Sequence, residues 1–192
     1  MDMRDQGAIA WLTRGIEDPF AAAEGALVAR ARTGDHWAFG ELVGPYKDRI
    51  LNLARRIVLD TDAAEDVTQE VFIRAYRQLH RFDGRARFAT WLYRIAINVS
   101  RTHLRAQQRR RNREAQHHPP GQKTPAPEAG DLVGLLGELP LPQRTALALF
   151  YLRELSVAEI ARLVGAPQGT VKAWLYRGRE RLRALARERG LL

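Results

Sequence analysis

The apolar positions in the first half of the chain follow the period of an α-helix. A helical pattern begins at Ala26 and breaks at Gly34-Asp35. Beyond the break, apolar side chains recur at intervals of four, four, three and four residues, at Leu42, Tyr46, Ile50, Leu53 and Ile57. Residues three and four apart share one face of a helix. The pattern therefore predicts one continuous helix face through these positions.

Two more helices are predicted downstream. Asp62, followed three residues later by Glu65, resembles a capping box and predicts a helix start. The buried stripe of this helix would be Val67, Val71, Ala75 and Leu79. After a loop at Arg81 to Arg85, a third helix would turn inward Phe88, Leu92, Ile95 and Val99. Three amphipathic helices of this length predict a compact all-α unit.

The pattern changes after Arg105, where a linker is predicted. Residues 107–113 are almost purely polar, and four prolines follow between His117 and Ala129. Such a composition favours an extended, partly disordered segment. Met1 to Glu24 also lacks a clear period, and we expect a weakly ordered extension there with at most a short helix around Ile9 to Leu12. The predicted parts are an extension (1–24), a helical domain (25–106), a linker (107–134) and a second helical domain (135–192).

The last part of the chain has the spacing of a helix-turn-helix. A capping box at Ser156 and Glu159 opens a short helix, Gly165 follows at the turn, and a second helix begins near Pro167. The expected core of the motif is Ile160, Ala161, Val164, Val171 and Trp174. Gly178 weakens the second helix by about 1 kcal/mol relative to alanine, and no sequence feature explains it.

The outward positions of that second helix are polar and basic: Gln168, Thr170, Lys172, Tyr176, Arg177 and Arg179. An ordinary helical hairpin is the alternative, but this face favours DNA. Residues nearest the helix start would reach base edges in a major groove. The arginines further along would meet phosphates, which gives affinity without sequence information.

Charge and composition narrow the function. The 192 residues carry a net charge of +9, which suggests a polyanionic partner such as nucleic acid, with a merely soluble basic protein as the alternative. The chain has no cysteine, which excludes disulfides, thiolate nucleophiles and cysteine-ligated zinc. The start lacks the apolar core of a secretory signal, and no run approaches 18 apolar residues. We therefore expect a cytoplasmic protein without membrane insertion.

The second and third predicted helices have opposite character. Residues 60–70 contain five acids and no lysine or arginine. The helix dipole explains the acids of the first turn but not Glu70. The ridge formed by Asp66, Gln69, Glu70 and Ile73 would repel DNA, which indicates a basic protein partner.

The third helix and the loop before it interleave arginines with aromatic rings. The arginines are Arg85, Arg87, Arg94, Arg101 and Arg105, and the rings are Phe82, Phe88, Trp91 and Tyr93. This combination binds single-stranded nucleic acid because every base can stack on a ring. For Phe88 we favour the alternative of a core position.

Three stretches resemble bacterial RNA polymerase sigma factors: DVTQEVFIRAY, FDGRARFATWLYRIAINVSR and SVAEIARLVGAPQGTVKAWLYRGRERL. The likeness is to the small extracytoplasmic-function type (group four) and covers about residues 26–106 and 135–186. It implies an all-α fold of two small helical domains, a region 2 bundle and a region 4 helix-turn-helix, joined by a flexible linker. It also implies an alternative sigma factor that binds core polymerase, recognises the minus-35 and minus-ten elements and promotes DNA melting.

The resemblance implies three sets of site residues. Binding to the clamp of the largest polymerase subunit falls to Asp66, Gln69, Glu70, Phe72 and Ile73. Minus-ten recognition and melting falls to Phe82, Asp83, Arg85, Arg87, Thr90, Trp91, Arg94, Asn98 and Arg101. Minus-35 reading falls to Gln168, Thr170, Lys172, Ala173, Tyr176, Arg177 and Arg179. Residues 107–134 match a segment threaded towards the polymerase active centre, and Thr102 departs from the family pattern, which often has an acid or asparagine there.

The expected partners are core RNA polymerase, promoter DNA as duplex and as melted non-template strand, and an anti-sigma factor. No cofactor, metal or catalytic residue is expected, and the free chain should be a monomer. Opening about ten base steps costs on the order of 14 kcal/mol, whereas stacking returns about 1–3 kcal/mol per base. Melting should therefore depend on the polymerase.

Two other functions compete with this interpretation. A free-standing helix-turn-helix repressor or activator would leave the acidic ridge and the aromatic helix without a role. An enzyme such as a nuclease is disfavoured, because His117 and His118 lie in the predicted linker, where a lone histidine pair is more often solvated than metal-binding.

Overall fold

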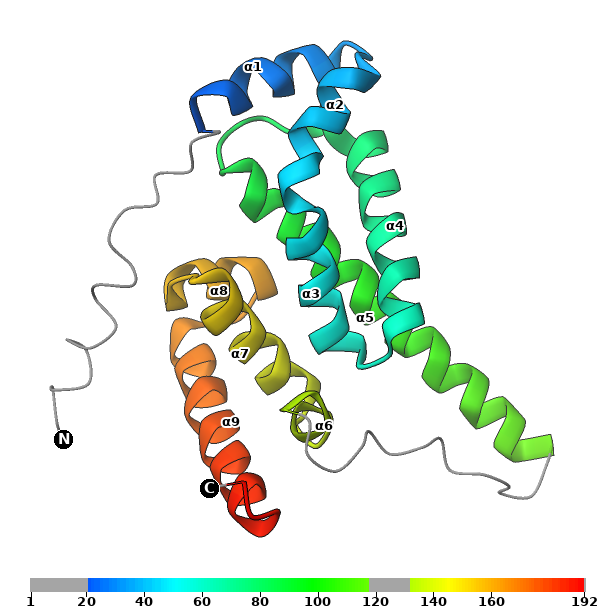
Figure 1. Cartoon of the computed structure of the whole chain (residues 1–192), viewed down its shortest axis with the longest axis vertical. Helices are drawn as coiled ribbons and strands as arrows, with labels where there is room; N and C mark the ends of the chain where they lie inside the picture. The colour runs from blue at the N-terminus through cyan, green and yellow to red at the C-terminus, as the bar shows by residue number, and fades with distance from the viewer. Residues whose placement is uncertain (1–20, 118–131, 192) are drawn as a thin grey trace, which may run out of the picture. The chain divides into compact units, whose positions relative to one another are not determined.

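The computed structural model describes residues 21–117 and 132–191. Within these two ranges the regular structure is helical and contains no strand, so the prediction of an all-α fold is confirmed. The described residues form two compact units, which divide between Gly44 and Pro45. Figure 1 shows the helices in chain order. The expected helix around Ile9 to Leu12 and residues 118–131 of the expected linker lie outside the described residues.

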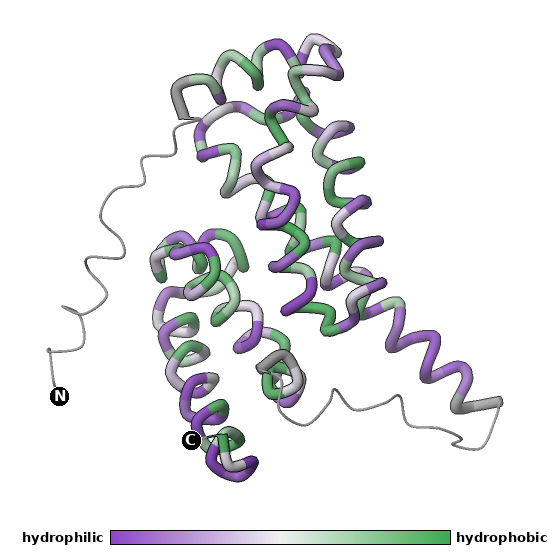
Figure 2. The backbone as a smooth tube through the Cα atoms, viewed as in Figure 1, coloured by the Kyte–Doolittle hydropathy of each residue, from purple (hydrophilic) through white to green (hydrophobic). Residues whose placement is uncertain are grey.

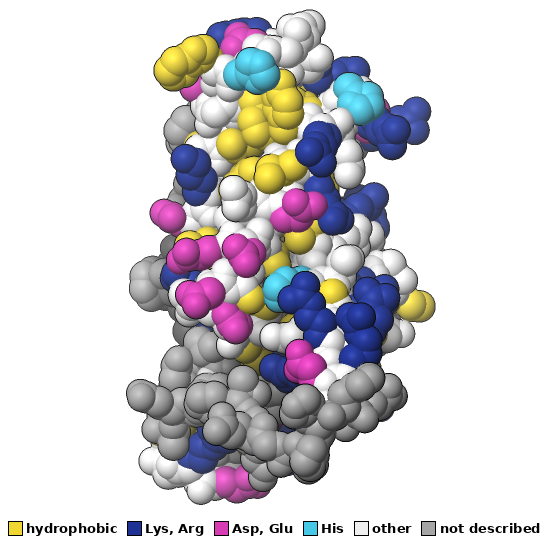
Figure 3. All heavy atoms as spheres, turned by 90° about the vertical axis from the view of Figure 1, so that its right-hand side faces the viewer, with side chains coloured by type: hydrophobic (Ala, Val, Ile, Leu, Met, Phe, Trp, Pro, Cys, Tyr) yellow, Lys and Arg dark blue, Asp and Glu magenta, His cyan; other side chains and the backbone are white. Residues whose placement is uncertain are grey.

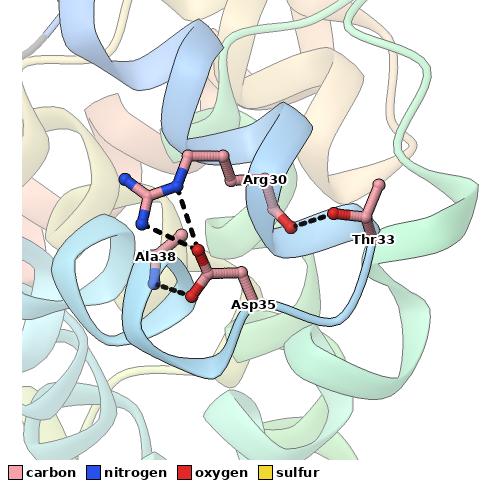
Figure 4. A network of polar contacts seen from close by, with 4 residues as sticks. All are labelled: Arg30, Thr33, Asp35 and Ala38. Carbon is pink, nitrogen blue, oxygen red and sulfur yellow. Dashed lines mark hydrogen bonds and ion pairs between the residues drawn. The ribbon is translucent and has the colours of Figure 1, made fainter.

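The first unit contains two helices, α1 (Ala21–Arg32) and α2 (His36–Val43), joined by a capped turn. Asp35 is the N-cap of α2, and its Oδ1 accepts a hydrogen bond from the backbone N–H of Ala38 at 3.0 Å. Its Oδ2 accepts two more from the Arg30 guanidinium at 2.7 and 3.0 Å (Figure 4). These bonds, the one from Ala38 first, hold the pKa of Asp35 below its ordinary value. The predicted break at Gly34-Asp35 is confirmed, and this capped turn is its cause.

The single helix predicted through residues 42–57 is wrong. Leu42 lies on α2, Tyr46 ends a 3-10 turn, η1 (Gly44–Tyr46), and the other three apolar positions lie on α3 (Lys47–Val58). The proline inside η1 has no N–H to continue an α-helical ladder. All five apolar positions are nevertheless buried. The periodicity therefore identified the buried residues but not the interruption of the helix.

Three helices of the second unit pack together: α3, α4 (Thr61–Gln78) and α5 (Phe88–His117) (Figure 1). The predicted inward stripes of the second and third helices are confirmed, since each member is at most 7% exposed. The predicted helix start was wrong by two residues. The N-cap of α4 is Asp60, whose side chain accepts a hydrogen bond from the N–H of Ala63 at 2.9 Å. Asp62 instead lies in the first turn of the helix.

The helix α5 runs well beyond its expected end. The sequence predicted a loss of helix after Arg105, but the structure continues α5 without interruption to His117. In Figure 2 the helix changes along its length from mixed colours to almost continuous purple, which marks the hydrophilic half. Residues 107–117 are therefore helix rather than extended linker. None of the helices in the described part of the chain combines the length and apolarity that a membrane span requires.

The C-terminal part contains four helices: α6 (Leu132–Gly137), α7 (Leu141–Arg153), α8 (Val157–Val164) and α9 (Gln168–Glu188). Both halves of the predicted capping box are present. Ser156 Oγ accepts from the N–H of Glu159 at 3.3 Å, and the N–H of Ser156 donates to Glu159 Oε2 at 2.9 Å. Gly165 ends α8 with a left-handed φ of 71°. The helix-turn-helix is confirmed, although Val164 and Trp174 of its expected core are only half-buried.

The structure explains Gly178. This glycine is buried on α9 where α9 packs against α7. A Cβ atom at this position would lie 2.8 Å from Leu147 Cδ1 and 3.5 Å from Gln143 Cβ. A contact under 3.0 Å requires the neighbour to move, so a glycine lets the two helices approach closely.

Candidate nucleic-acid and protein interfaces

The predicted polymerase-binding residues lie on the outer side of α4. Asp66, Gln69 and Ile73 are exposed, whereas Glu70 and Phe72 are half-buried. The first three follow one another at intervals of three and four residues and therefore share a face. Figure 3 shows acidic side chains gathered on the side of the molecule that carries α4.

Some acids of α4 have partners within the chain. Glu70 forms an ion pair with Arg74, one turn later, at 2.5 Å. Glu65 lies 3.7 Å from Arg55 of α3. The first pair supplies a structural reason for Glu70, the acid that the helix dipole left unexplained. Among the described residues Asp66 forms no salt bridge, so its charge is fully available to a partner.

An aromatic cluster lies at the start of α5. The rings of Phe82, Phe88 and Trp91 have centroids 5.3 to 5.8 Å apart, and Tyr46 packs edge-on against Phe88 at 5.6 Å. Phe88 is fully buried, as expected, and Phe82 is only 6% exposed. Trp91 is half-buried. Of the rings predicted to stack on bases, Trp91 is the most accessible, Phe82 packs against it from inside, and Tyr93 is buried.

The loop before α5 is exposed and held by local contacts. Asp83 Oδ1 accepts a hydrogen bond from the N–H of Arg85 at 3.1 Å, and the two side chains form an ion pair at 3.3 Å. Gly84 between them has a φ of 74°, a left-handed conformation that glycine adopts without strain. The loop therefore presents Arg85 and Arg87 to solvent on a defined turn.

The polar residues predicted to bind the minus-ten element follow one side of α5. Arg94 and Asn98 are exposed, and Thr90 and Arg101 are half-buried. Burial, and then the charge of Arg105, lower the pKa of Arg101 from its ordinary value. A guanidinium remains charged at neutral pH. Arg94 Nη2 also donates a long hydrogen bond, 3.4 Å, to the backbone oxygen of Arg162 on α8.

The predicted minus-35 residues lie on the outer side of α9. Gln168, Lys172, Tyr176 and Arg177 are exposed, and Thr170, Ala173 and Arg179 are half-buried. Val171 and Leu175 point into the core and fix the rotation of the helix. The start of α8, the first helix of the motif, is held by Glu159, whose pKa is lowered by hydrogen bonds from the Ser156 side chain and backbone. The first two turns of α9 therefore present polar side chains from a rigid motif.

Two features were missed by sequence reasoning. Arg144 on α7 is only 7% exposed, and its Nε has no hydrogen-bond partner in the structure. Burial lowers its pKa. No sequence signal distinguished it from surface arginines. The second is the arginine-rich continuation of α5, which composition alone assigned to a linker. The described residues contain no group of three or more His, Asp or Glu side chains that could hold a metal ion.

Comparisons with known proteins agree with this arrangement. The sequence profile of Sigma-70 region 2 matches residues 42–110, and that of Sigma-70, region 4 matches residues 130–182. The RNA polymerase sigma-H factor of Pseudomonas aeruginosa is 37% identical, with 80% of this chain and 89% of the relative covered. The ECF RNA polymerase sigma factor SigW of Bacillus subtilis is 33% identical, with 84% and 95% covered. The ECF RNA polymerase sigma-E factor of Escherichia coli is 36% identical, with 80% and 89% covered.

The chain belongs to the extracytoplasmic-function (ECF) type of bacterial RNA polymerase sigma factors, and it is an alternative sigma factor. Among solved structures, CnrH in complex with the cytosolic domain of CnrY is similar with a TM-score of 0.67 and 27% identity, covering 86% of this chain and 98% of that one. RpoE of Bartonella quintana, in complex with the anti-sigma factor NepR, has a TM-score of 0.62 at 24% identity, covering 78% and 96%. The second likeness concerns the fold alone. The comparisons lend no support to a free-standing repressor or activator.

Proposed function

We propose that this sigma factor docks on the clamp of core RNA polymerase through the outer side of α4. The support is a negative surface with an exposed apolar side chain at its end, on a protein of net charge +9. Ile73 is 38% exposed, unusual for an isoleucine, and follows Asp66, Gln69 and Glu70 along the same face of α4. An apolar contact flanked by polar and charged groups is typical of a specific protein interface.

Promoter recognition is divided between two helices in this proposal. On α5, Trp91 offers a ring for an unpaired base, while Arg94, Asn98 and the loop arginines contact the backbone of the minus-ten strand. On α9, Gln168, Thr170 and Lys172 reach base edges of the minus-35 element. Arg177 and Arg179 contact its phosphates.

The observation that carries the proposal is the opposite chemistry of two packed helices. One small bundle presents the acids of α4 on one helix and the arginines of α5, with the half-buried ring of Trp91, on another. Opening ten base steps costs roughly 14 kcal/mol, and stacking on one or two accessible rings returns far less than this. The factor therefore selects and captures a strand, while the polymerase supplies the remaining free energy.

The test is transcription in vitro with purified core polymerase and the DNA upstream of this protein's own gene. The expected result is a defined start site that appears only when both proteins are present. No gain in affinity for core polymerase and no start-site selection would refute the proposal. A two-fold symmetric footprint by the protein alone on duplex DNA would instead favour the repressor or activator.

The proposal also covers an anti-sigma partner, the oligomeric state, the location and the domain limits. CnrH was solved with the cytosolic domain of CnrY, and RpoE of Bartonella quintana with the anti-sigma factor NepR. We propose that an anti-sigma factor masks the polymerase- and DNA-binding surfaces of this chain. We further propose a monomeric free factor that acts in the cytoplasm, with domains at 25–106 and 135–192. Co-purification with products of flanking genes tests the masking, and sedimentation of the free chain tests the monomer.

A further inference from the structure

The side of α5 that carries the predicted minus-ten residues continues in one line beyond them. An α-helix turns by about 100° per residue. Arg94, Asn98, Arg101, Arg105 and Arg109 therefore fall within about 80° of one another around the helix axis. The last two are exposed, and Arg101 is half-buried. We call Arg101, Arg105 and Arg109 the arginine stripe.

The like charges of the arginine stripe repel one another, and the described part of the chain offers them no ion-pair partner. Its members follow one another at i, i+4 spacing, where like charges destabilise a helix by about 0.2–0.5 kcal/mol per pair. None of the salt bridges within the described residues involves any of the three. Burial, and after it the like charge of Arg105, lowers the pKa of Arg101. An external polyanion would relieve the repulsion.

The surroundings of the arginine stripe favour duplex DNA over single-stranded nucleic acid. Residues 100–117 contain no Phe, Tyr or Trp, so this half of α5 offers no aromatic ring for an unstacked base. A straight helix with regularly spaced guanidinium groups matches a regular row of phosphates. From Arg94 to Arg109 the helix rises about 22 Å at 1.5 Å per residue, equal to about six base pairs at 3.4 Å each.

We propose that the arginine stripe binds the phosphate backbone of duplex DNA that directly adjoins the minus-ten element. This inference rests on the proposed function, because Arg94 and Asn98 on the same line of α5 are assigned to the minus-ten strand. The helix then carries both contacts, with rings for the opened strand at its start and guanidinium groups for the closed duplex further along. The contact adds affinity without sequence preference, as phosphate contacts do.

Two double variants test the inference with matched charge. Arg105→Gln/Arg109→Gln removes two charges from the arginine stripe. Arg110→Gln/Arg111→Gln removes two charges about 120–140° away around the same helix. Glutamine keeps the helix propensity close to that of arginine. Each variant is assembled with core polymerase, and binding to a duplex promoter fragment is measured over a series of salt concentrations.

The expected result is a smaller salt dependence for the stripe variant alone. Each lost phosphate contact lowers the slope of log Kobs against log salt by about 0.9, so the stripe variant should lose up to about 1.8. The control variant should lose less than half of that. A hydroxyl-radical footprint should show loss of protection on the duplex side of the minus-ten element, with the minus-35 protection kept. Equal slopes for the two variants would overturn the inference.

Three further arms identify the partner. Weaker binding of the stripe variant to core polymerase without DNA would overturn the inference in favour of a protein contact. An equal loss on a single-stranded oligonucleotide or RNA of the same length would overturn it in favour of single-strand binding. Wild-type transcription with core polymerase is measured in parallel. If wild-type transcription fails, the proposed function fails. If it succeeds and the slopes stay equal, only the inference fails.

Discussion

At the residue scale, two contacts position α9, the helix that we propose to read the minus-35 element. Gly178 lets α9 approach α7 so closely that a Cβ would lie 2.8 Å from Leu147 Cδ1. The Ser156 and Glu159 capping box holds the first helix of the motif. Both contacts act through backbone placement rather than through a side chain that touches DNA. Substitutions at these positions should therefore change stability before they change recognition.

Gly178→Ala should destabilise the protein. The added methyl group overpacks the helix crossing, which typically costs about 1–3 kcal/mol, and the gain in helix propensity returns about 1 kcal/mol. We expect the free energy of unfolding in urea to fall by about 1 kcal/mol. Gly169→Ala, on the same helix with no atom within 4 Å of the new Cβ, is the control and should not destabilise. A stabilised Gly178→Ala variant would show that the crossing can relax.

Glu159→Gln should reduce stability in a pH-dependent way. Ser156 lowers the pKa of Glu159 in the folded protein, so the charged carboxylate stabilises the fold above the unfolded pKa near 4.5. This stabilisation is lost as the pH falls through the folded value. The difference between wild type and variant should be largest at neutral pH and vanish in acid, measured by thermal unfolding. A difference that stays constant with pH for Glu159→Gln would contradict the linkage.

At the element scale, the sequence predicted which residues are buried better than where helices begin and end. The apolar stripes of α4 and α5 were correct, because a buried face leaves a repeating pattern. The first residue of a helix depends on which of two neighbouring residues takes the N-cap, such as Asp60 or Asp62. The spacing of apolar positions does not decide between them. The extension of α5 beyond Arg105 lacks an apolar period, because residues 108–114 are exposed and bury no side chain. A helix that projects into solvent has no apolar stripe, so apolar periodicity does not detect it, although glutamine and arginine are good helix formers.

Gln108→Pro should unfold the projecting part of α5 and leave the bundle intact. Proline removes one backbone hydrogen bond and clashes with the preceding turn, at about 3 kcal/mol in a helix interior. We expect loss of amide hydrogen-exchange protection around residues 104–114, with protection of residues 88–99 unchanged. Gln108→Ala is the control and should keep protection throughout. If residues 104–114 exchange freely in the wild type, the helix does not persist there.

At the scale of the whole molecule, the charges are sorted by partner. The net charge of +9 conceals a negative side on α4, because the excess of arginine lies on α5 and α9. The candidate surfaces could be predicted from sequence, since their motifs are local. Their accessibility could not, because the ring of Phe82 turns inward against Phe88 and Trp91. Only the packed structure distinguishes a ring available to a base from one that supports it.

Trp91→Ala and Glu70→Lys should separate the two activities. Loss of one stacking ring, about 1–3 kcal/mol, should lower open-complex formation roughly 5- to 150-fold and leave affinity for core polymerase near the wild-type value. Glu70→Lys should do the reverse, as measured by polymerase binding and permanganate footprinting. Arg74→Gln breaks the same ion pair but keeps the acid, so it should retain polymerase binding. Equal loss of both activities in both variants would contradict the division.

Because α5 is uninterrupted, it fixes both the distance and the rotation about the helix axis between any two of its residues. One residue inserted between Asn98 and Arg105 would rotate everything beyond it by about 100° and turn Arg105 and Arg109 away from their line. Seven inserted residues would restore the phase almost completely, about 10 Å further out. If a flexible tether joined the two DNA contacts instead, neither insertion would have these effects. The geometry of a single helix would thus set the spacing between the contact to the opened strand and the contact to the closed duplex.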